Sequence, residues 1–370
     1  MTSQGQGAVI EFDAVTKVYP GAAAPSVDRL SLRIEAGEIC ALVGPSGSGK
    51  TTAMRMINRL IEPTQGEVRI NGQSNHALPV EELRRSIGYV IQSGGLFPHR
   101  TILDNVGTVP RLLGWDERTI VARAREVLDL VGLSPDTYGA RYPSQLSGGQ
   151  RQRVGVARAL AADPPLMLMD EPFGAIDPVV REKIQDEFLR LQAHVGKTIV
   201  IVTHDLDEAM RMGDKVAVLR EGGVLAQCGT PSELLAAPAD DFVSQFVGSD
   251  RALRRLSLLT IGEVRIIELA EAAKQGFTLY VDEHGRPVQW SDGSPVLTCL
   301  GVGMNLRSAL SELLTWGINF APVVDDAGRL IGVASSDVIR AALHTAAGTA
   351  AVFDGPHPAP RTTIPQAAAG

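Results

Sequence analysis

The chain has 370 residues, 44% hydrophobic and 21% charged, which is enough apolar material for two domains. A net charge of −7 argues against a dedicated nucleic-acid binder, and three widely spaced cysteines favour neither a disulfide framework nor a zinc site. No run approaches the roughly 18 to 20 apolar residues of a membrane-spanning helix, and the polar N-terminus lacks the apolar segment of a signal peptide. We therefore expect a protein of the reducing cytosol, with any membrane-spanning part on another polypeptide.

Residues 8–245 alternate short β-branched runs with amphipathic helical stretches, which is typical of an α/β unit. The continuous apolar runs predict strands buried on both faces, as in a parallel sheet. These runs lie at residues 67–70, 166–169, 198–202 and 215–219. A further stretch, residues 116–131, predicts a helix with one apolar stripe.

A glycine-rich loop follows the apolar run at residues 38–43 and precedes a predicted helix at 51–60. Strand, glycine loop and helix is the context in which the pattern G-x-x-x-x-G-K-[ST] binds the phosphates of a nucleoside triphosphate. In this arrangement backbone N–H groups face the phosphates, the lysine neutralises them, and the hydroxyl of Thr51 ligates Mg2+. The loop residues are Gly44, Pro45, Ser46, Gly47, Ser48, Gly49, Lys50 and Thr51.

A second glycine motif, LSGGQ, occupies residues 146–150, before a predicted helix that opens at Arg151. A serine hydroxyl, bare N–H groups and a helix dipole together make an anion site. Its residues are Ser147, Gly148, Gly149 and Gln150.

Two carboxylates, Asp170 and Glu171, end the apolar run at 166–169. A buried strand delivers such acids to its carboxyl edge, beside a phosphate loop in the same sheet. There Asp170 is predicted to support Mg2+, and Glu171 to orient or deprotonate the attacking water. His204 is likewise polar and follows the end of the apolar run at 198–202.

Together these motifs resemble the ATP-binding-cassette (ABC) ATPases over residues 8 to about 245. The resemblance implies a P-loop fold with a mixed-sheet core and a helical subdomain, and two ATP molecules held between two copies of the chain. Ser147 to Gln150 would then complete the site of the second copy, and His204 would hold the γ-phosphate and water. Family positions further imply that Tyr19 stacks on adenine, that Gln92 touches metal and water, and that Asp177 meets the partner copy.

Residues 96–106 and 153–160 look like segments of bacterial importers, and the junction at 246–257 is similar to ATP-binding subunits of glycine betaine, choline and carnitine importers. This implies an ATPase at the cytoplasmic face of the membrane, peripheral to it, which powers osmoprotectant uptake through separate permease subunits served by an extracytoplasmic substrate-binding protein. Two alternatives stay open: an importer with another cargo, such as an amino acid, and a soluble ABC ATPase that acts on nucleic acid or a ribosome.

A second, smaller α+β unit is expected at residues 250–345, with a helix at 306–316, strands at 320–325 and 330–334, and a helix from Ser336. Residues 305–344 resemble a cystathionine-β-synthase-type (CBS) repeat, and 254–300 a degenerate first repeat. The spacing from Gly332 to Asp337 is one residue short of the family's nucleotide-contact pattern. A dimerising role and a regulatory role, through a bound nucleotide or ionic strength, both stay open. Residues 346–370 are expected to be disordered.

Overall fold

The computed structural model describes residues 7–91, 95–174, 178–248, 250–264, 266–274 and 278–342. The chain divides into two compact units, Met1–Leu234 with Pro238–Phe246 and Leu235–Ala237 with Val247–Gly370. Within the described ranges, every helix is too short or too polar to cross a bilayer.

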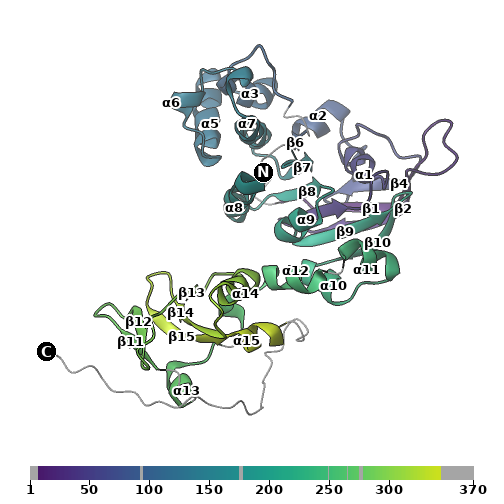
Figure 1. Ribbon diagram of the computed structural model, residues 1–370. Helices are drawn as coiled ribbons and strands as arrows, with labels where there is room; N and C mark the ends of the chain where they lie inside the picture. Colours follow the sequence, from purple (N-terminus) through teal and green to yellow (C-terminus); the bar gives the residue numbers. More distant parts are fainter. Residues whose placement is uncertain are drawn as a thin grey trace. The chain divides into compact units, whose positions relative to one another are not determined.

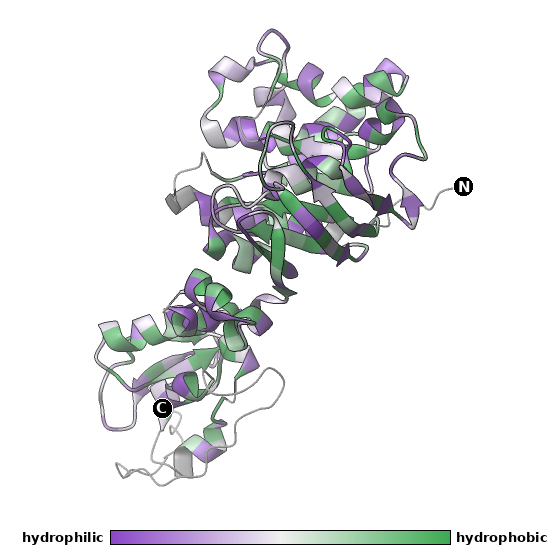
Figure 2. Ribbon diagram, turned by 90° about the vertical axis from the view of Figure 1, so that its right-hand side faces the viewer, coloured by the Kyte–Doolittle hydropathy of each residue, from purple (hydrophilic) through white to green (hydrophobic). Residues whose placement is uncertain are grey.

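A six-stranded sheet of order β10-β9-β3-β8-β7-β6 forms the centre of the first unit. Neighbours from β9 to β6 are parallel, and β10 is antiparallel to β9. Every residue of β3, β7 and β8 is buried, which confirms the strands expected from the apolar runs there, and Figure 2 shows the hydrophobic colour along the sheet. The strands are β3 Ile39–Val43, β6 Ile87–Val90, β7 Leu166–Asp170, β8 Thr198–Val202, β9 Lys215–Arg220 and β10 Val224–Gly229.

A second, antiparallel sheet has the order β2-β1-β4-β5. Residues 67–70 belong to its strand β4, so the expectation of a parallel strand buried on both faces is wrong there. Only Val68 of β4 is buried, and its neighbours Glu67 and Arg69 form an ion pair at 2.8 Å. Such alternation is typical of an antiparallel sheet with one solvated face. The strands are β1 Ile10–Lys17, β2 Val27–Ile34, β4 Gln65–Ile70 and β5 Gln73–Ser74.

Helices α3, α5, α6 and α7 gather at one end of the first unit (Figure 1), and α7 also packs against strand β6 of the six-stranded sheet. The predicted apolar stripe of α5 is buried, and its residues belong to the same hydrophobic core as those of α7. The helices up to residue 247 are α1 Lys50–Ile57, α2 Val80–Arg85, α3 Ile102–Val106, α4 Thr108–Leu112, α5 Glu117–Leu130, α6 Pro135–Tyr138, α7 Gly148–Leu160, α8 Pro178–Val195, α9 Leu206–Met212, α10 Pro231–Ala236 and α11 Asp241–Val247, with a 3-10 turn at Pro143–Gln145.

The second unit contains a hairpin, β11-β12, and a three-stranded sheet, β13-β14-β15, and its helices α13 and α15 contact β15. Its core gathers buried leucines of α12 and α14 with residues of β14, β15 and α15. The two helices and two strands expected from residue 306 onward are present. Wherever an end of an element was predicted, the observed end differs from it by no more than one residue. They are α12 Arg251–Leu258, a 3-10 turn Ile261–Glu263, α13 Leu269–Lys274, β11 Leu279–Val281, β12 Pro287–Trp290, β13 Leu300–Gly301, α14 Leu306–Thr315, β14 Phe320–Val324, β15 Leu330–Ser335 and α15 Ser336–Ala341.

The two hairpins of this unit, β11-β12 and β14-β15, share one turn design. In each, an aspartate Oδ1 accepts the N–H groups of the residues two and four positions later; the aspartates are Asp282 and Asp325. The N–H of Leu330 donates to the carbonyl of Gly285 at 2.9 Å and joins the two turns. After β15 comes a helix, α15, whereas residues 291–299 after β12 form turns and irregular chain. The internal likeness of the two halves thus stops at the end of β12.

Candidate active site

The predicted catalytic segments meet at one edge of the six-stranded sheet. Strands β3, β8 and β7 are parallel neighbours, so their carboxyl ends lie side by side. In the register, Val202 at the end of β8 is paired with Leu42 of β3 on one side and Asp170 of β7 on the other. The phosphate loop after β3, the acids at the end of β7 and His204 after β8 therefore share this edge.

Two glycines set the backbone path of the phosphate loop. Gly44 has φ +153°, and a Cβ there would lie 2.1 Å from the carbonyl oxygen of Leu219. Gly49, immediately before α1, has φ +77°, and a Cβ there would lie 2.2 Å from the carbonyl oxygen of Ser26. No side chain fits at either position, so both glycines are required by close backbone approach as well as by conformation.

Lys50, the first residue of α1, lies across the loop. Its Nζ donates to the carbonyl oxygens of Gly44 at 2.8 Å and Pro45 at 2.9 Å, and lies 3.4 Å from Ser48 Oγ. Partial burial lowers the pKa of Lys50, and the charges of the two acids at the end of β7 oppose that shift. Within the loop, Ser46 and Gly47 are exposed and Ser48 is buried.

Thr51 and Asp170 lie together, as a magnesium site requires. The hydroxyl of Thr51 donates to Asp170 Oδ1 at 3.1 Å, and the carboxylate is almost fully buried. A hydroxyl and a carboxylate are hard oxygen donors, so this pair fits Mg2+.

Arg55 is a site residue that the sequence analysis missed. Its Nη2 donates to Asp170 Oδ2 at 3.3 Å, and a hydrogen bond with Tyr89 raises the pKa of Arg55. The guanidinium therefore holds the second carboxylate oxygen while Thr51 holds the first. A signal existed in the sequence, because Arg55 is four residues after Thr51 and so lies on the same face of the helix.

Glu171 and His204 form a second pair, with 3.1 Å between Glu171 Oε1 and His204 Nδ1. The side chain of Glu171 is 24% exposed and that of His204 is 66% exposed, so the pair lies at the border with solvent. Glu171 also has a φ of +46°, which is strained for a residue with a Cβ, and its N–H donates to the carbonyl of Val202 at 2.8 Å. This backbone turn points the carboxylate toward the histidine.

Tyr19 lies beside the start of α1. Its hydroxyl oxygen is 3.4 Å from Thr52 Oγ1, and the residue is 40% exposed. The Nζ of Lys17 lies 5.3 Å from the ring centroid. An exposed aromatic ring next to the phosphate loop is the arrangement needed for stacking on a base.

The second glycine motif differs from the prediction in where its helix begins. Helix α7 starts at Gly148 instead of Arg151, because Ser147 and Gln150 form a capping box. Ser147 Oγ accepts the N–H of Gln150 at 3.3 Å, and Gln150 Oε1 accepts the N–H of Ser147 at 2.9 Å. Both glycines therefore belong to the first helical turn. The amide of Gln150 also donates to the hydroxyl of Tyr138 at 3.2 Å.

Two of the predicted site residues, Gln92 and Asp177, lie outside the described residues. The strand β6 that leads toward Gln92 is paired with β7, with Val90 opposite Met169.

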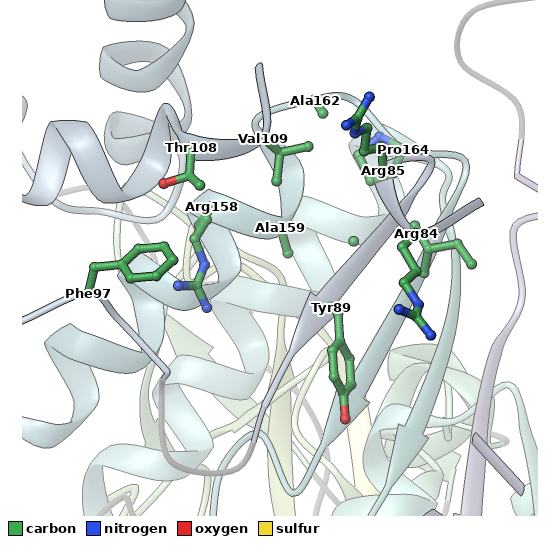
Figure 3. Close-up of a pocket in the computed structure, with 12 residues that line it drawn as sticks. Arg84, Arg85, Tyr89, Phe97, Thr108, Val109, Arg158, Ala159, Ala162 and Pro164 are labelled. Atoms are coloured by element: carbon green, nitrogen blue, oxygen red, sulfur yellow. The ribbon is translucent and has the colours of Figure 1, made fainter. Parts of the chain in front are cut away.

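A pocket of about 230 Å³ opens beside β6, between it and helices α4 and α7 (Figure 3). The arginines Arg84, Arg85 and Arg158 contribute to its wall, together with the aromatic residues Tyr89 and Phe97. Arg158 donates to the carbonyl of Gly95 at 2.7 Å, and burial lowers its pKa. The pocket thus combines apolar surface with cationic groups.

Comparisons with known proteins point to one family. A family model described as "ABC transporter" matches residues 27–174. The chain is 42% identical to the osmoprotectant import ATP-binding protein OsmV of Salmonella typhimurium and 41% identical to the choline transport ATP-binding protein OpuBA of Bacillus subtilis. Both alignments cover 90% of this chain and 95% of the relative.

Among solved structures, the chain resembles the ATP-binding cassette MJ0796 in a dimeric post-hydrolysis state bound to ADP and Pi. The TM-score is 0.54 at 36% identity, and the match covers 60% of this chain and 98% of the other.

Proposed function

The chain belongs to the ABC transporter family, and from this membership we propose that it is the ATP-hydrolysing subunit of an importer for quaternary-amine osmoprotectants of the glycine betaine, choline and carnitine class. The observation that carries the cargo class is the extent of the match. It covers 90% of the chain with two relatives named for osmoprotectant and choline transport, so it includes most of the second unit. If the similarity were only that of the cassette that all such transporters share, the match would cover the first unit alone.

ATP hydrolysis is assigned to the shared edge of β3, β7 and β8. The loop N–H groups and the N-terminus of α1 bind the phosphates, and Lys50 exchanges its two carbonyl partners for phosphate oxygens. Glu171 accepts the proton of the attacking water. His204, 3.1 Å from that carboxylate, holds the water and the γ-phosphate.

Mg2+ is assigned to Thr51 and Asp170, with Gln92 as a further ligand. When bound, the ion neutralises charge on the phosphate oxygens during transfer. Arg55 keeps the Asp170 carboxylate turned toward the Thr51 hydroxyl, since each holds one of its oxygens.

A second copy of the chain completes each ATP site. Ser147, Gly148, Gly149 and Gln150 then face the ATP held by the partner, and Asp177 contacts the partner copy. The capping box supports this role because it fixes the first turn of α7, and N–H groups at the N-terminus of a helix bind anions. The dimeric cassette that this chain resembles is consistent with such an assembly.

The membrane permease is assigned to the pocket beside β6. The pocket is lined by Tyr89 and Phe97, which stand on either side of Gln92 in the sequence, so a partner seated there would sense the ATP site. Its three arginines and Phe97 suit a segment with acidic and apolar side chains. In this arrangement the protein lies peripherally on the cytoplasmic face of the membrane, an extracytoplasmic substrate-binding protein delivers the cargo, and nucleic acid has no part.

The second unit has two proposed roles, a dimerising one and a regulatory one, through a bound nucleotide or ionic strength. Equilibrium binding of AMP to the full chain with Glu171→Gln, with the ATP sites saturated by MgATP, separates the nucleotide-binding role from the dimerising one. The nucleotide-binding role requires AMP to bind to the second unit, whereas a purely dimerising unit leaves AMP unbound.

The proposed cargo class is tested by uptake into vesicles that contain the cognate permease. We expect ATP-dependent accumulation of radiolabelled glycine betaine, choline or carnitine, and none with Glu171→Gln in place of the natural chain. Accumulation of an amino acid instead would reject the cargo class and keep the importer. Co-purification with nucleic acid and no permease would reject import altogether.

Tyr19→Ala is expected to raise the KM for ATP by about tenfold with little change in kcat, since base stacking on an aromatic ring is worth roughly 1–3 kcal/mol. Tyr19→Phe keeps the ring and should keep the KM. The control is Tyr280→Ala in the second unit, which should leave ATP affinity unchanged. Equal KM values for the alanine and phenylalanine variants would rule out stacking.

A further inference from the structure

Glu208 is a buried carboxyl that the reaction as described leaves unused. It lies on α9, four residues after His204, and is only 4% exposed. Its Oε1 has no hydrogen-bond partner among the residues that the structure describes. A buried carboxyl with an unpartnered oxygen is costly, and such groups persist mainly where they serve a function.

The carboxyl of Glu208 is connected to the histidine loop through Thr203. The side chain of Thr203 hydrogen-bonds Glu208, and its Oγ1 also accepts the N–H of Asp205 at 3.0 Å. Thr203 and Asp205 are the residues immediately before and after His204, so these two hydrogen bonds hold the backbone on both sides of the histidine. Asp205 in turn forms an ion pair with Arg181 of α8, with 3.0 Å between Oδ2 and Nη1, and its Oδ1 caps α9.

Burial, nearby charges and a hydrogen bond shift the pKa of the Glu208 carboxyl. Burial, first, and then the negative charges of Asp205 and Glu171 raise the pKa of Glu208 to about 7, while the Thr203 hydrogen bond and Arg181 act in the opposite direction. Below pH 7 the group is therefore mostly neutral, and above it mostly charged. The charged form needs a cation, and Arg181 is already paired with Asp205.

We propose that Glu208 is a positioning residue for ATP hydrolysis, which holds the His204 loop through Thr203 while it is an uncharged acid. When Glu208 ionises, its carboxylate draws the Thr203 hydroxyl more strongly, competes with Asp205 for Arg181 and repels Glu171, so the loop is displaced from that placement. This inference rests on the role proposed above for His204.

Glu208→Gln tests the proposal, because the amide keeps the shape and a hydrogen bond to Thr203 but cannot ionise. The kcat of the full chain is measured at saturating MgATP from pH 6 to pH 8. The neutral fraction of a group with a pKa of about 7 falls about tenfold over this range, so kcat of the natural chain should fall by up to that factor. Glu208→Gln should stay within about twofold across the range. Glu182→Gln, on the exposed side of α8, should keep the profile of the natural chain.

Thr203→Val provides a second test, because it removes the hydroxyl that joins Glu208 to the loop. Its kcat at pH 6 should fall about threefold to tenfold with the KM for ATP unchanged, and the fall in kcat between pH 6 and pH 8 should disappear, because the ionisation of Glu208 no longer reaches the loop. Identical pH profiles for the natural chain and Glu208→Gln, or a natural pH profile in Thr203→Val, would overturn the proposal. If His204→Ala hydrolyses ATP normally, the failure lies instead in the proposed role of His204.

Discussion

Glu171→Gln is expected to abolish ATP turnover while ATP binding is retained and the dimer is trapped. The amide fills the same space as the carboxylate and keeps a hydrogen bond toward His204, but it cannot accept a proton from water. General-base catalysis is worth roughly 10²–10⁴-fold, so kcat should fall by at least about 100-fold. The phosphate loop and the Thr51–Asp170 pair are untouched, so affinity for MgATP should persist.

Three measurements on this variant are needed: steady-state phosphate release, equilibrium binding of ATP, and sedimentation with and without MgATP. The matched control is Glu126→Gln, an exposed glutamate on α5, which should behave as the natural chain does. Normal phosphate release from Glu171→Gln would assign the general base to another residue. A monomer in the presence of MgATP would contradict the trapped dimer.

Activity should return when two inactive variants, Lys50→Ala and Ser147→Arg, are mixed. In the proposed dimer every site takes its phosphate loop from one copy and its glycine motif from the other, so each homodimer carries a defect in both of its sites. A mixed dimer gathers both defects in one site and leaves the other intact. If copies exchange freely, half of the dimers are mixed, and about a quarter of the normal site activity should return.

This experiment is read as phosphate release against the ratio of the two variants, with a maximum expected at equal amounts. The control mixture is Lys50→Ala with Glu171→Gln. Both defects then lie on the phosphate-loop side, so every site of a mixed dimer keeps one defect and no activity should return. Recovery in the control mixture, or none in the test mixture, would contradict a site shared between copies.

Much of the active site was predictable because its residues are close in sequence to strand ends. Lys50 and Thr51 follow one buried strand, Asp170 and Glu171 end another, and His204 follows a third. Parallel neighbours present their carboxyl ends at one edge, so correct strands already bring these groups together.

The prediction failed where a residue depends on partners far away in the chain. Residues 67–70 were expected in the parallel sheet but pair with β1, and a short run of four residues cannot reveal its partner. The helix of the second glycine motif begins three residues earlier than expected for a local reason, since the capping box of Ser147 and Gln150 places both glycines in its first turn. Arg55 was missed because its partner Asp170 is 115 residues away.

By itself, then, the sequence determined the chemistry: a phosphate loop, an acid pair, a histidine and a second anion motif, each carried by a local pattern. Only the tertiary structure decided how that chemistry is held in place. Asp170 takes one oxygen contact from Thr51 and one from Arg55, and Glu208 is buried beside Thr203 where its pKa rises to about 7. Burial and long-range hydrogen bonds depend on which segments pack together, and that information is spread over the whole chain instead of residing in any one motif.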